Sequence, residues 1–326
     1  MAVSSVMFEV RRPKVPLGLC FVGALAALSS AYILSCSRPV PASPALASPP
    51  ATTASKEFPQ LAFDQSLHDR LPKEILERNV VRVSTTAYTP PLVFYAADNR
   101  QIIGIDADII RALEVLYGVK FEMTDLGNFA AIVPTLRAKR FDMSIGGFYD
   151  TVRAEQQVDL VNFLRDGMVI MVKRGNPHGI HSVEDLCGKT VAVTMATPTE
   201  DVVLEQAKSC ANPIHVMSMP KMTDVQLALR TGRAAAIVGG YCTGVYTTTR
   251  QIGNGAGLEA IQNAKMGEGL LGIVFAKNND QLRDAIQLGL QRLIDTGAYQ
   301  AILKKWGVTP LAIQKATINN AAGDKL

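Results

Sequence analysis

The chain reads Asp108-Ile-Ile-Arg-Ala-Leu-Glu-Val-Leu-Tyr117, then Gly118, then Val119-Lys-Phe-Glu-Met123. In the first run the apolar residues recur at i, i+1, i+4 and i+5, which is the period of an amphipathic helix. Gly118 is a residue that commonly ends a helix, and the second run has the short apolar pattern of a strand. The stretch therefore predicts a helix followed at once by a strand.

The same alternation of helix and strand is predicted on both sides of this stretch. Strands are predicted at 80–83 and 141–145, and Asn128 is placed to cap a helix that reaches about residue 140. A second series after Ser182 alternates strands at 190–194, 214–217 and 234–238 with helices at 199–208 and 223–231, and ends with helices at 280–295 and 298–306. Strands that alternate with helices predict parallel sheets covered on both faces, and two series predict two α/β lobes.

Composition agrees with two folded domains. The chain has 326 residues, where a domain usually takes about 100–200. It is 48% hydrophobic and 19% charged, which excludes a disordered chain. The net charge of +4 is too small to indicate nucleic-acid binding, so no nucleic-acid partner is predicted.

The N-terminus has the pattern of an export signal. Arg11, Arg12 and Lys14 are followed by an uncharged stretch from 17 to 34, which raises the mean hydropathy to +0.15. Ile33-Leu-Ser-Cys36 resembles a bacterial lipobox, which implies cleavage before Cys36 and diacylation of its thiol. An uncleaved anchor or an ordinary secretory signal are the alternatives.

Residues 1–35 are thus predicted to be a lipoprotein-type signal peptide, and residues 36–60 a Pro/Ala/Ser-rich tether. We expect the protein in the periplasm or on the outer face of the cell membrane, bound to the membrane through a lipid anchor.

No familiar catalytic, metal-binding or nucleotide-binding motif is present in the sequence, so neither catalytic residues nor a metal nor a cofactor is predicted. An exported protein permits a disulfide between Cys187 and Cys210, because one precedes a predicted strand and the other follows the next helix. Cys242 would then remain free and buried.

At Ile103-Gly-Ile-Asp-Ala-Asp-Ile-Ile-Arg-Ala-Leu113 the chain resembles the signature of family 3 bacterial solute-binding proteins, the amino-acid-type receptors of ABC importers. Further matching pieces stand in the family's order at 85–92, before this signature, and at 128–136, 141–153, 158–159, 183–193 and 299–307, after it. The resemblance covers about 80–310.

This resemblance implies an α/β fold of the type II periplasmic-binding-protein kind, with two lobes joined by a two-strand hinge and a ligand in the cleft. Lobe I would comprise 78–172 and 270–310, lobe II 173–269, and a C-terminal tail 311–326. The crossing strands would be 169–172 and 271–275.

The resemblance also implies ligand-binding residues. Arg153 matches the arginine that holds the ligand α-carboxylate, and Phe129 matches the aromatic ring that stacks on the ligand side chain. Tyr88 stands one residue before the usual aromatic position, which here is Thr89. The other matching positions are Gly146, Phe148, Thr194, Thr197, Gly240 and Tyr241.

Two departures concern the ligand's amino group. The acids that hold the ammonium in amino-acid receptors would fall at Gly240 and Thr86, where this chain has none. A buried ammonium without an acceptor is costly. The sequence therefore predicts a small carboxylate-bearing ligand and leaves its amino group open, with Glu268 or Asp150 as substitute acids.

The predicted function is the substrate-binding component of an ABC importer, a monomer that delivers a small-molecule ligand to permease and ATPase subunits. The alternatives are a receptor for a non-amino organic acid, a sensory module, and a periplasmic enzyme similar to cyclohexadienyl dehydratase. The enzyme would need a poised acid in the cleft, for which Glu200 and Glu268 are the candidates in lobe II.

Overall fold

The computed structural model describes residues 58, 60–250 and 257–321, without the side chains of 262–266. The chain divides between Ser48 and Pro49, and every described residue belongs to the second part. The predicted signal peptide, the lipidation site Cys36 and most of the predicted tether lie outside the described residues.

One eight-stranded sheet runs through both lobes. Its order is β5 (Lys120–Asp125), β1 (Val80–Thr85), β6 (Met143–Tyr149), β11 (Leu258–Ala276), β7 (Val158–Lys173), β10 (Ala236–Gly240), β8 (Thr190–Thr194) and β9 (His215–Met219). The strands at the two ends pair in parallel, whereas β7 and β11 pair antiparallel with each other and with their outer neighbours. The predicted mixed α/β fold is confirmed.

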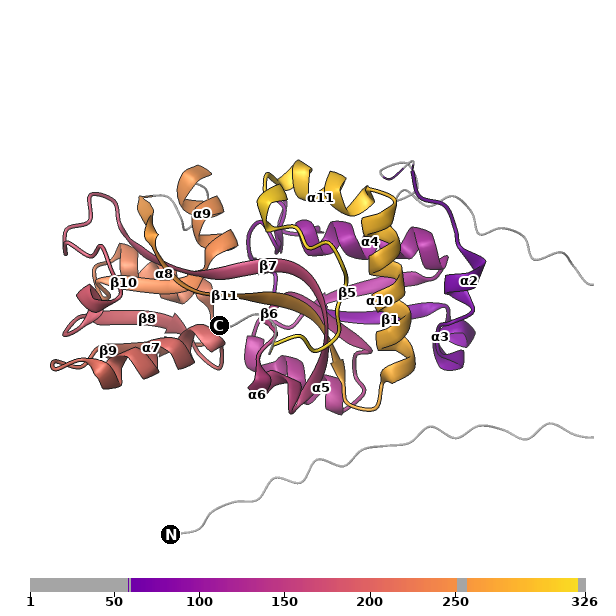
Figure 1. The fold of residues 1–326 in the computed structure, drawn as a ribbon, viewed down its shortest axis with the longest axis horizontal. Helices are drawn as coiled ribbons and strands as arrows, with labels where there is room; N and C mark the ends of the chain where they lie inside the picture. Colours follow the sequence, from indigo (N-terminus) through magenta and orange to yellow (C-terminus); the bar gives the residue numbers. More distant parts are fainter. Residues whose placement is uncertain (1–57, 59, 251–256, 322–326) are drawn as a thin grey trace, which may run out of the picture. The chain divides into compact units, whose positions relative to one another are not determined.

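The long strands β7 and β11 pass side by side from one lobe to the other (Figure 1). On β7, Phe163 and Leu164 pack in the core of lobe I, whereas Met168 already packs in a core of lobe II. The chain therefore crosses before Met168, and the predicted crossing at 169–172 was placed too late. The sequence of β7 is apolar in both lobes, so it does not indicate at which residue the chain passes from one lobe to the other.

Helices cover both faces of the lobe I sheet. In Figure 1, α4 (Ile105–Tyr117) and α11 (Ala298–Trp306) lie above its strands, and α5 (Ile132–Arg137) and α6 (Val152–Glu155) lie below them. Three further helices belong to this lobe, namely α2 (Gln65–His68), α3 (Lys73–Arg78) and α10 (Asp280–Asp295).

The start of α4 requires glycine. Gly104 has φ +128°, and a Cβ there would lie 2.2 Å from the carbonyl oxygen of Leu92. This close approach lets the N–H groups of Ile105 and Asp106 donate to Pro91 O and Leu92 O, each at 2.9 Å. The helix ends at Gly118 in the left-handed conformation, as the sequence predicts.

Lobe I extends beyond the predicted limits at both ends. Phe58 and Leu71 are buried in its core, so the lobe begins well before residue 78. Ile313 and Ala316 are buried in the same core, and Asn162 N donates to Thr317 O at 2.9 Å. Residues 311–321 are therefore part of lobe I rather than a separate tail.

Lobe II has two cores on opposite faces of its strands. Met168 and Ile170 of β7 point into one core, and Val169 and Met171 point into the other, with the alternation of a strand buried on both faces. Helix α7 (Pro198–Ser209) covers the first face and α8 (Met222–Arg230) the second, while α9 (Tyr241–Arg250) follows β10.

The cysteines of lobe II are arranged as the sequence suggests. Cys187 and Cys210 form a disulfide with a Cα–Cα distance of 5.5 Å, which joins the segment before β8 to the end of α7. Cys242, the second residue of α9, is a buried free thiol whose pKa is raised by burial.

Candidate ligand-binding cleft

A small chamber of about 60 Å³ lies between the two lobes. Loops at the ends of β1, β6 and β8 line it, which is where ligands bind in open α/β sheets. Seven predicted ligand-binding residues line this chamber, namely Tyr88, Thr89, Phe129, Gly146, Thr194, Thr197 and Gly240.

A vestibule of about 370 Å³ adjoins the chamber and shares Phe129, Thr197 and Pro198 with it. Phe148 lines the vestibule rather than the chamber, and its ring stacks on that of Phe129 with centroids 5.0 Å apart and planes at 19°. The two rings form an aromatic wall beside the passage between chamber and vestibule.

Polar side chains at the chamber lack partners. The hydroxyls of Thr86 and Thr194 are buried and have no hydrogen-bond partner among the described residues. Such unpaired groups cost about 1–3 kcal/mol each, so they favour a site that is completed by a polar ligand. Tyr88 packs against the lobe II core around Met222, and burial raises its pKa to about 12.

Arg153 lies outside the chamber. It lines the vestibule, its side chain is 73% exposed, and its Nη1 lies 3.0 Å from Oδ2 of Asp201 on α7. The short helix α6 begins at Val152 and is capped by Thr151, whose hydroxyl accepts from Ala154 N at 3.1 Å. Ala154 is the residue that packs on the core beside Phe129. This orientation turns Arg153 outward, and its contact with a ligand carboxylate stays a prediction.

Asp166 is the residue that sequence reasoning missed. It lies on β7 between the lobes, lines the chamber and is 5% exposed. Its Oδ2 accepts from the hydroxyl of Tyr149 on β6, and its Oδ1 accepts from Cys242 N at the start of α9, both at 2.8 Å. The signal was available, because Arg165-Asp166 interrupts the apolar run of a strand that crosses between the lobes.

Tyr149 keeps its proton beside this carboxylate. Burial first, and then the charge of Asp166, raise the pKa of Tyr149 well above its usual value. The hydroxyl therefore keeps its single proton at physiological pH, and it lies within hydrogen-bond distance of both Asp166 Oδ2, at 2.8 Å, and Gly167 O, at 2.7 Å.

Three other predicted residues lie away from the chamber. Tyr241 lines a separate cavity of about 330 Å³ beside Trp306. Glu268 is exposed and is not among the residues that line the chamber. Asp150 is buried, and its Oδ2 accepts from Asn162 Nδ2 and Asn320 N, so it holds the C-terminal segment instead.

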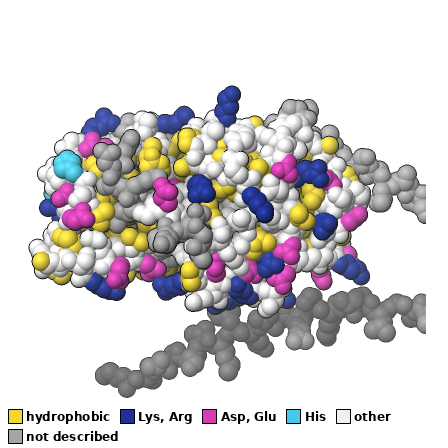
Figure 2. Space-filling view, in the orientation of Figure 1, with side chains coloured by type: hydrophobic (Ala, Val, Ile, Leu, Met, Phe, Trp, Pro, Cys, Tyr) yellow, Lys and Arg dark blue, Asp and Glu magenta, His cyan; other side chains and the backbone are white. Residues whose placement is uncertain are grey.

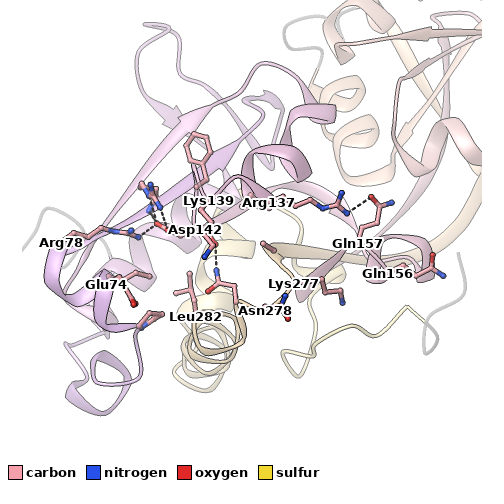
Figure 3. Close-up of a pocket in the computed structure, with 17 residues that line it drawn as sticks. Glu74, Arg78, Arg137, Lys139, Asp142, Gln156, Gln157, Lys277, Asn278 and Leu282 are labelled. Atoms are coloured by element: carbon pink, nitrogen blue, oxygen red, sulfur yellow. Dashed lines mark hydrogen bonds and ion pairs between the residues drawn. The ribbon is translucent and has the colours of Figure 1, made fainter.

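A larger groove of about 750 Å³ lies on lobe I, away from the cleft (Figure 3). Arg78 and Arg82 on its wall both pair with Asp142, and Lys277 pairs with Asp159. These basic side chains are bound to carboxylates of the protein, and none of the predicted site residues lines this groove.

The described residues show two further absences. None of their helices is long and apolar enough to cross a membrane, and no group of three His, Cys, Asp or Glu among them could hold a metal ion. Figure 2 shows side chains of both charge signs interspersed over the face in view.

Two α/β lobes that are joined by two crossing strands and enclose a chamber define a hinged solute-binding protein. The chain belongs to the bacterial extracellular solute-binding proteins, family 3, whose sequence model matches residues 81–309. The predicted family is therefore confirmed, and its members act outside the cytoplasm.

Individual relatives agree with this family. The arginine-binding protein ArgT of Corynebacterium glutamicum is 28% identical over 76% of this chain and 81% of its own length. An ancestral arginine-binding protein bound to arginine is similar in structure, with a TM-score of 0.63 and 29% identity over 70% of this chain and 98% of its own. An ancestral amino acid-binding protein, a precursor of cyclohexadienyl dehydratase, has a TM-score of 0.64 and 25% identity over 72% and 97% of the two chains.

Proposed function

We propose that the protein is the amino-acid-binding component of an ABC importer and that its ligand is a basic amino acid such as arginine. The lobes would close around the ligand and present it to permease and ATPase subunits. The chain would act as a monomer on the outer face of the cell membrane, held there by a lipid on Cys36.

The observation that carries this proposal is the charge of the cleft. The described residues that line the chamber and the vestibule include three carboxylates, Asp166, Glu200 and Asp201, but only two arginines, Arg137 and Arg153. Carboxylates that line a cleft favour a ligand that carries a positively charged group. The names of the relatives, which include arginine-binding proteins, support the same ligand class.

The cleft also offers a place for the ligand's α-carboxylate. Thr197 and Thr199 at the first turn of α7 line the chamber, and α7 has 12 residues. The N-terminus of such a helix favours an anion, and the unpaired hydroxyl of Thr194 lies at the same chamber. A carboxylate bound there would interact with the N-terminus of α7 and accept a hydrogen bond from the Thr194 hydroxyl.

The ligand side chain would then extend into the vestibule. Phe129 and Phe148 form the wall along this path, and Glu200 and Asp201 also line the vestibule. A guanidinium stacks favourably on aromatic rings and pairs with carboxylates, so an extended basic side chain suits this path.

Isothermal titration calorimetry of the full chain tests the proposal. We expect L-arginine to bind with micromolar or tighter affinity, L-glutamine more weakly, and succinate not at all. Binding of succinate with no binding of any amino acid would contradict the proposal and favour a receptor for organic acids.

The enzyme alternative is tested in the same preparation. Prephenate and arogenate incubated with the protein should remain unchanged, because a binding protein needs no general acid. Turnover of either compound would establish the dehydratase activity instead.

A further inference from the structure

The C-terminal segment, residues 317–321, is hydrogen-bonded along β7 in lobe I. Asn162 of β7 is fully buried, and it donates its main-chain N–H to Thr317 O at 2.9 Å. Its side-chain oxygen accepts from the Thr317 hydroxyl at 2.8 Å. Two residues farther along, Asn319 N donates to Leu160 O at 3.0 Å, and Leu160 N donates to the Asn319 side chain at 2.9 Å. The segment is therefore held in a defined register against the strand.

The same segment ends on two acids at the two ends of α6. Asn320 N donates to Oδ2 of Asp150, which lies just before the helix, at 2.8 Å. Ala321 N donates to Oε1 of Glu155, the last residue of the helix, also at 2.8 Å. Asn162 Nδ2 donates to the same Asp150 oxygen at 2.8 Å. The C-terminal segment thus contacts both ends of the short helix that lines the vestibule.

Asp150 and Glu155 form a pair of neighbouring acids. Asp150 is 2% exposed, and its Oδ1 is buried with no hydrogen-bond partner among the described residues. Burial first, and then the charge of Glu155 and a hydrogen bond with it, raise the pKa of Asp150 to about 6, against the two donors to Oδ2, which lower it. Two carboxylates this close repel each other when both are charged, and one proton between them gives the buried oxygen a partner.

The other charged side chains on the elements around this pair are ion-paired elsewhere or exposed to solvent. They are Arg153 on α6, which pairs with Asp201, then Asp159 on β7, which pairs with Lys277 and Arg283, and the exposed Arg165 of β7 and Glu268 of β11. Residues 317–321 have no charged side chain. The titration of this region therefore depends on the acid pair itself.

We infer that Asp150 and Glu155 share one proton while the C-terminal segment is bound, and that this proton controls how firmly the segment positions α6 at the vestibule. The inference rests on the proposed function, because α6 lines the cleft in which the ligand is proposed to bind. With the shared proton, the buried Asp150 oxygen is satisfied and both main-chain donors keep their acceptors. When the proton is released to solvent, the half-buried Glu155 is repelled from Asp150, and its hydrogen bond with Ala321 N is weakened.

The direction of the pH effect follows from linkage. The bound segment raises the pKa of Asp150, so this arrangement binds the proton more strongly than a released segment does. It is therefore most stable below pH 6 and loses stability as the pH rises through about 6. Helix α6 includes Ala154, which packs beside Phe129, and Arg153, which pairs with lobe II, so a loosened helix weakens ligand binding. Asp150 and Glu155 are thus positioning residues that act on the cleft through α6.

The test measures hydrogen exchange of the C-terminal peptide and the affinity for L-arginine at pH 5 and pH 7, both with the full chain. Exchange is followed by mass spectrometry and corrected for its intrinsic dependence on pH. From pH 5 to pH 7 the protection of the peptide should fall about five- to tenfold, because a group with a pKa of about 6 loses most of its proton over this range. L-Arginine should bind about two- to tenfold more weakly at pH 7. The range ends there because Asp106, with a pKa of about 8, stays mostly protonated.

Amide variants imitate the protonated pair. Asp150→Asn and Glu155→Gln each place an N–H donor between the two side chains and keep an oxygen for the main-chain donors. Both should protect the peptide and bind L-arginine at pH 7 as wild type does at pH 5, whereas loss of a merely structural contact would weaken both. Glu155→Ala removes the acceptor of Ala321 N and should show low protection at both pH values. Glu122→Gln, an exposed acid on β5, is the control and should behave as wild type.

Thermal melting shows whether each variant is folded, and either amide variant suffices if the other is unstable. Equal protection of wild type at the two pH values, or faster exchange in a folded amide variant than in wild type at pH 7, would overturn this inference alone. A fall in protection without any change in the affinity for L-arginine would overturn the action on the cleft. A wild type that binds no L-arginine at either pH would overturn the proposed function, while hydrogen exchange still decides whether the proton is shared.

Discussion

Arg153 on α6 and Asp201 on α7 form an ion pair between the lobes, with 3.0 Å from Nη1 to Oδ2. Both side chains are mostly exposed, at 73% and 54%, and the pair lies at the vestibule rather than in the chamber. An exposed pair of this kind contributes about 0–1 kcal/mol and is screened by salt. The pair therefore contributes only slightly to holding the two lobes together.

Substituting Arg153 by Ala should weaken ligand binding only about fivefold or less, and Asp201→Ala should have a similar effect. The difference from wild type should disappear at about 1 M salt, where charges are screened within about 3 Å. Calorimetry at two salt concentrations measures this. A loss of several hundredfold in Arg153→Ala alone would show instead that Arg153 binds the ligand carboxylate directly, as the resemblance implies.

The aromatic wall should discriminate among ligand side chains. Phe148→Leu removes one of two stacked rings while preserving apolar volume, so the affinity for L-arginine should fall by about 0.5–2 kcal/mol through the lost cation–π contact. The affinity for L-glutamine should change less. Phe141→Leu is the matched control, since Phe141 packs against the same core but lines the lobe I groove. Equal losses for both ligands would contradict a side-chain role for the wall.

The sequence predicts the helices and strands of this protein better than the directions of its side chains. The helix at 105–117 and the strand after it follow from apolar period and a terminal glycine, which are local properties. The site loops followed from matching the order of motifs, and seven of the ten predicted ligand-binding residues do line one chamber.

What the sequence could not predict depends on side-chain direction and on contacts across the hinge. Arg153 points outward because it lies next to the buried side of the four-residue helix α6 and not on it. A sequence motif gives the position of a residue along the chain but not the side of a short helix on which its side chain lies. Asp166 was missed because its side chain reaches the chamber beside Gly240, which lies 74 positions later in the sequence. The pairing of β7 with β10 brings the two positions together.

The disulfide should stabilise lobe II without affecting the ligand. Replacing Cys187 and Cys210 by Ala should lower the free energy of unfolding by about 2–4 kcal/mol. Without the disulfide the unfolded chain gains conformational entropy, because the segment between the two residues is no longer closed into a loop. Urea unfolding measures the loss, and affinity should be unchanged because neither residue lines the cleft. Adding a reductant should destabilise wild type to the same extent and leave the double variant unaffected.

The predicted lipid anchor is tested by a substitution at Cys36. Cys36→Ser should release the chain from the membrane fraction into the soluble fraction, since a lipobox cysteine supplies the thiol that is acylated. Cell fractionation measures the distribution, and mass spectrometry of the N-terminal peptide identifies the lipid. Cys20→Ser, in the apolar part of the same predicted signal, is the control and should keep the chain on the membrane.

Asp106 in the first turn of α4 should give the stability of lobe I an unusual dependence on pH. It is fully buried, neither carboxylate oxygen has a hydrogen-bond partner among the described residues, and burial raises its pKa from 3.8 to about 8. The folded state therefore binds this proton more strongly than the unfolded state, so the group destabilises the fold progressively as pH rises from about 4 to 8.

Asp106→Asn removes this titration while nearly preserving the shape of the side chain. The variant should match wild type near pH 4 and exceed it by a few kcal/mol in free energy of unfolding at pH 8–9, because each unit of pKa shift corresponds to about 1.4 kcal/mol. Urea unfolding across this range measures the difference, with Asp98→Asn in an exposed loop as the control. A variant that is less stable than wild type at pH 9 would show that the carboxylate is charged and bound by a partner in the folded protein.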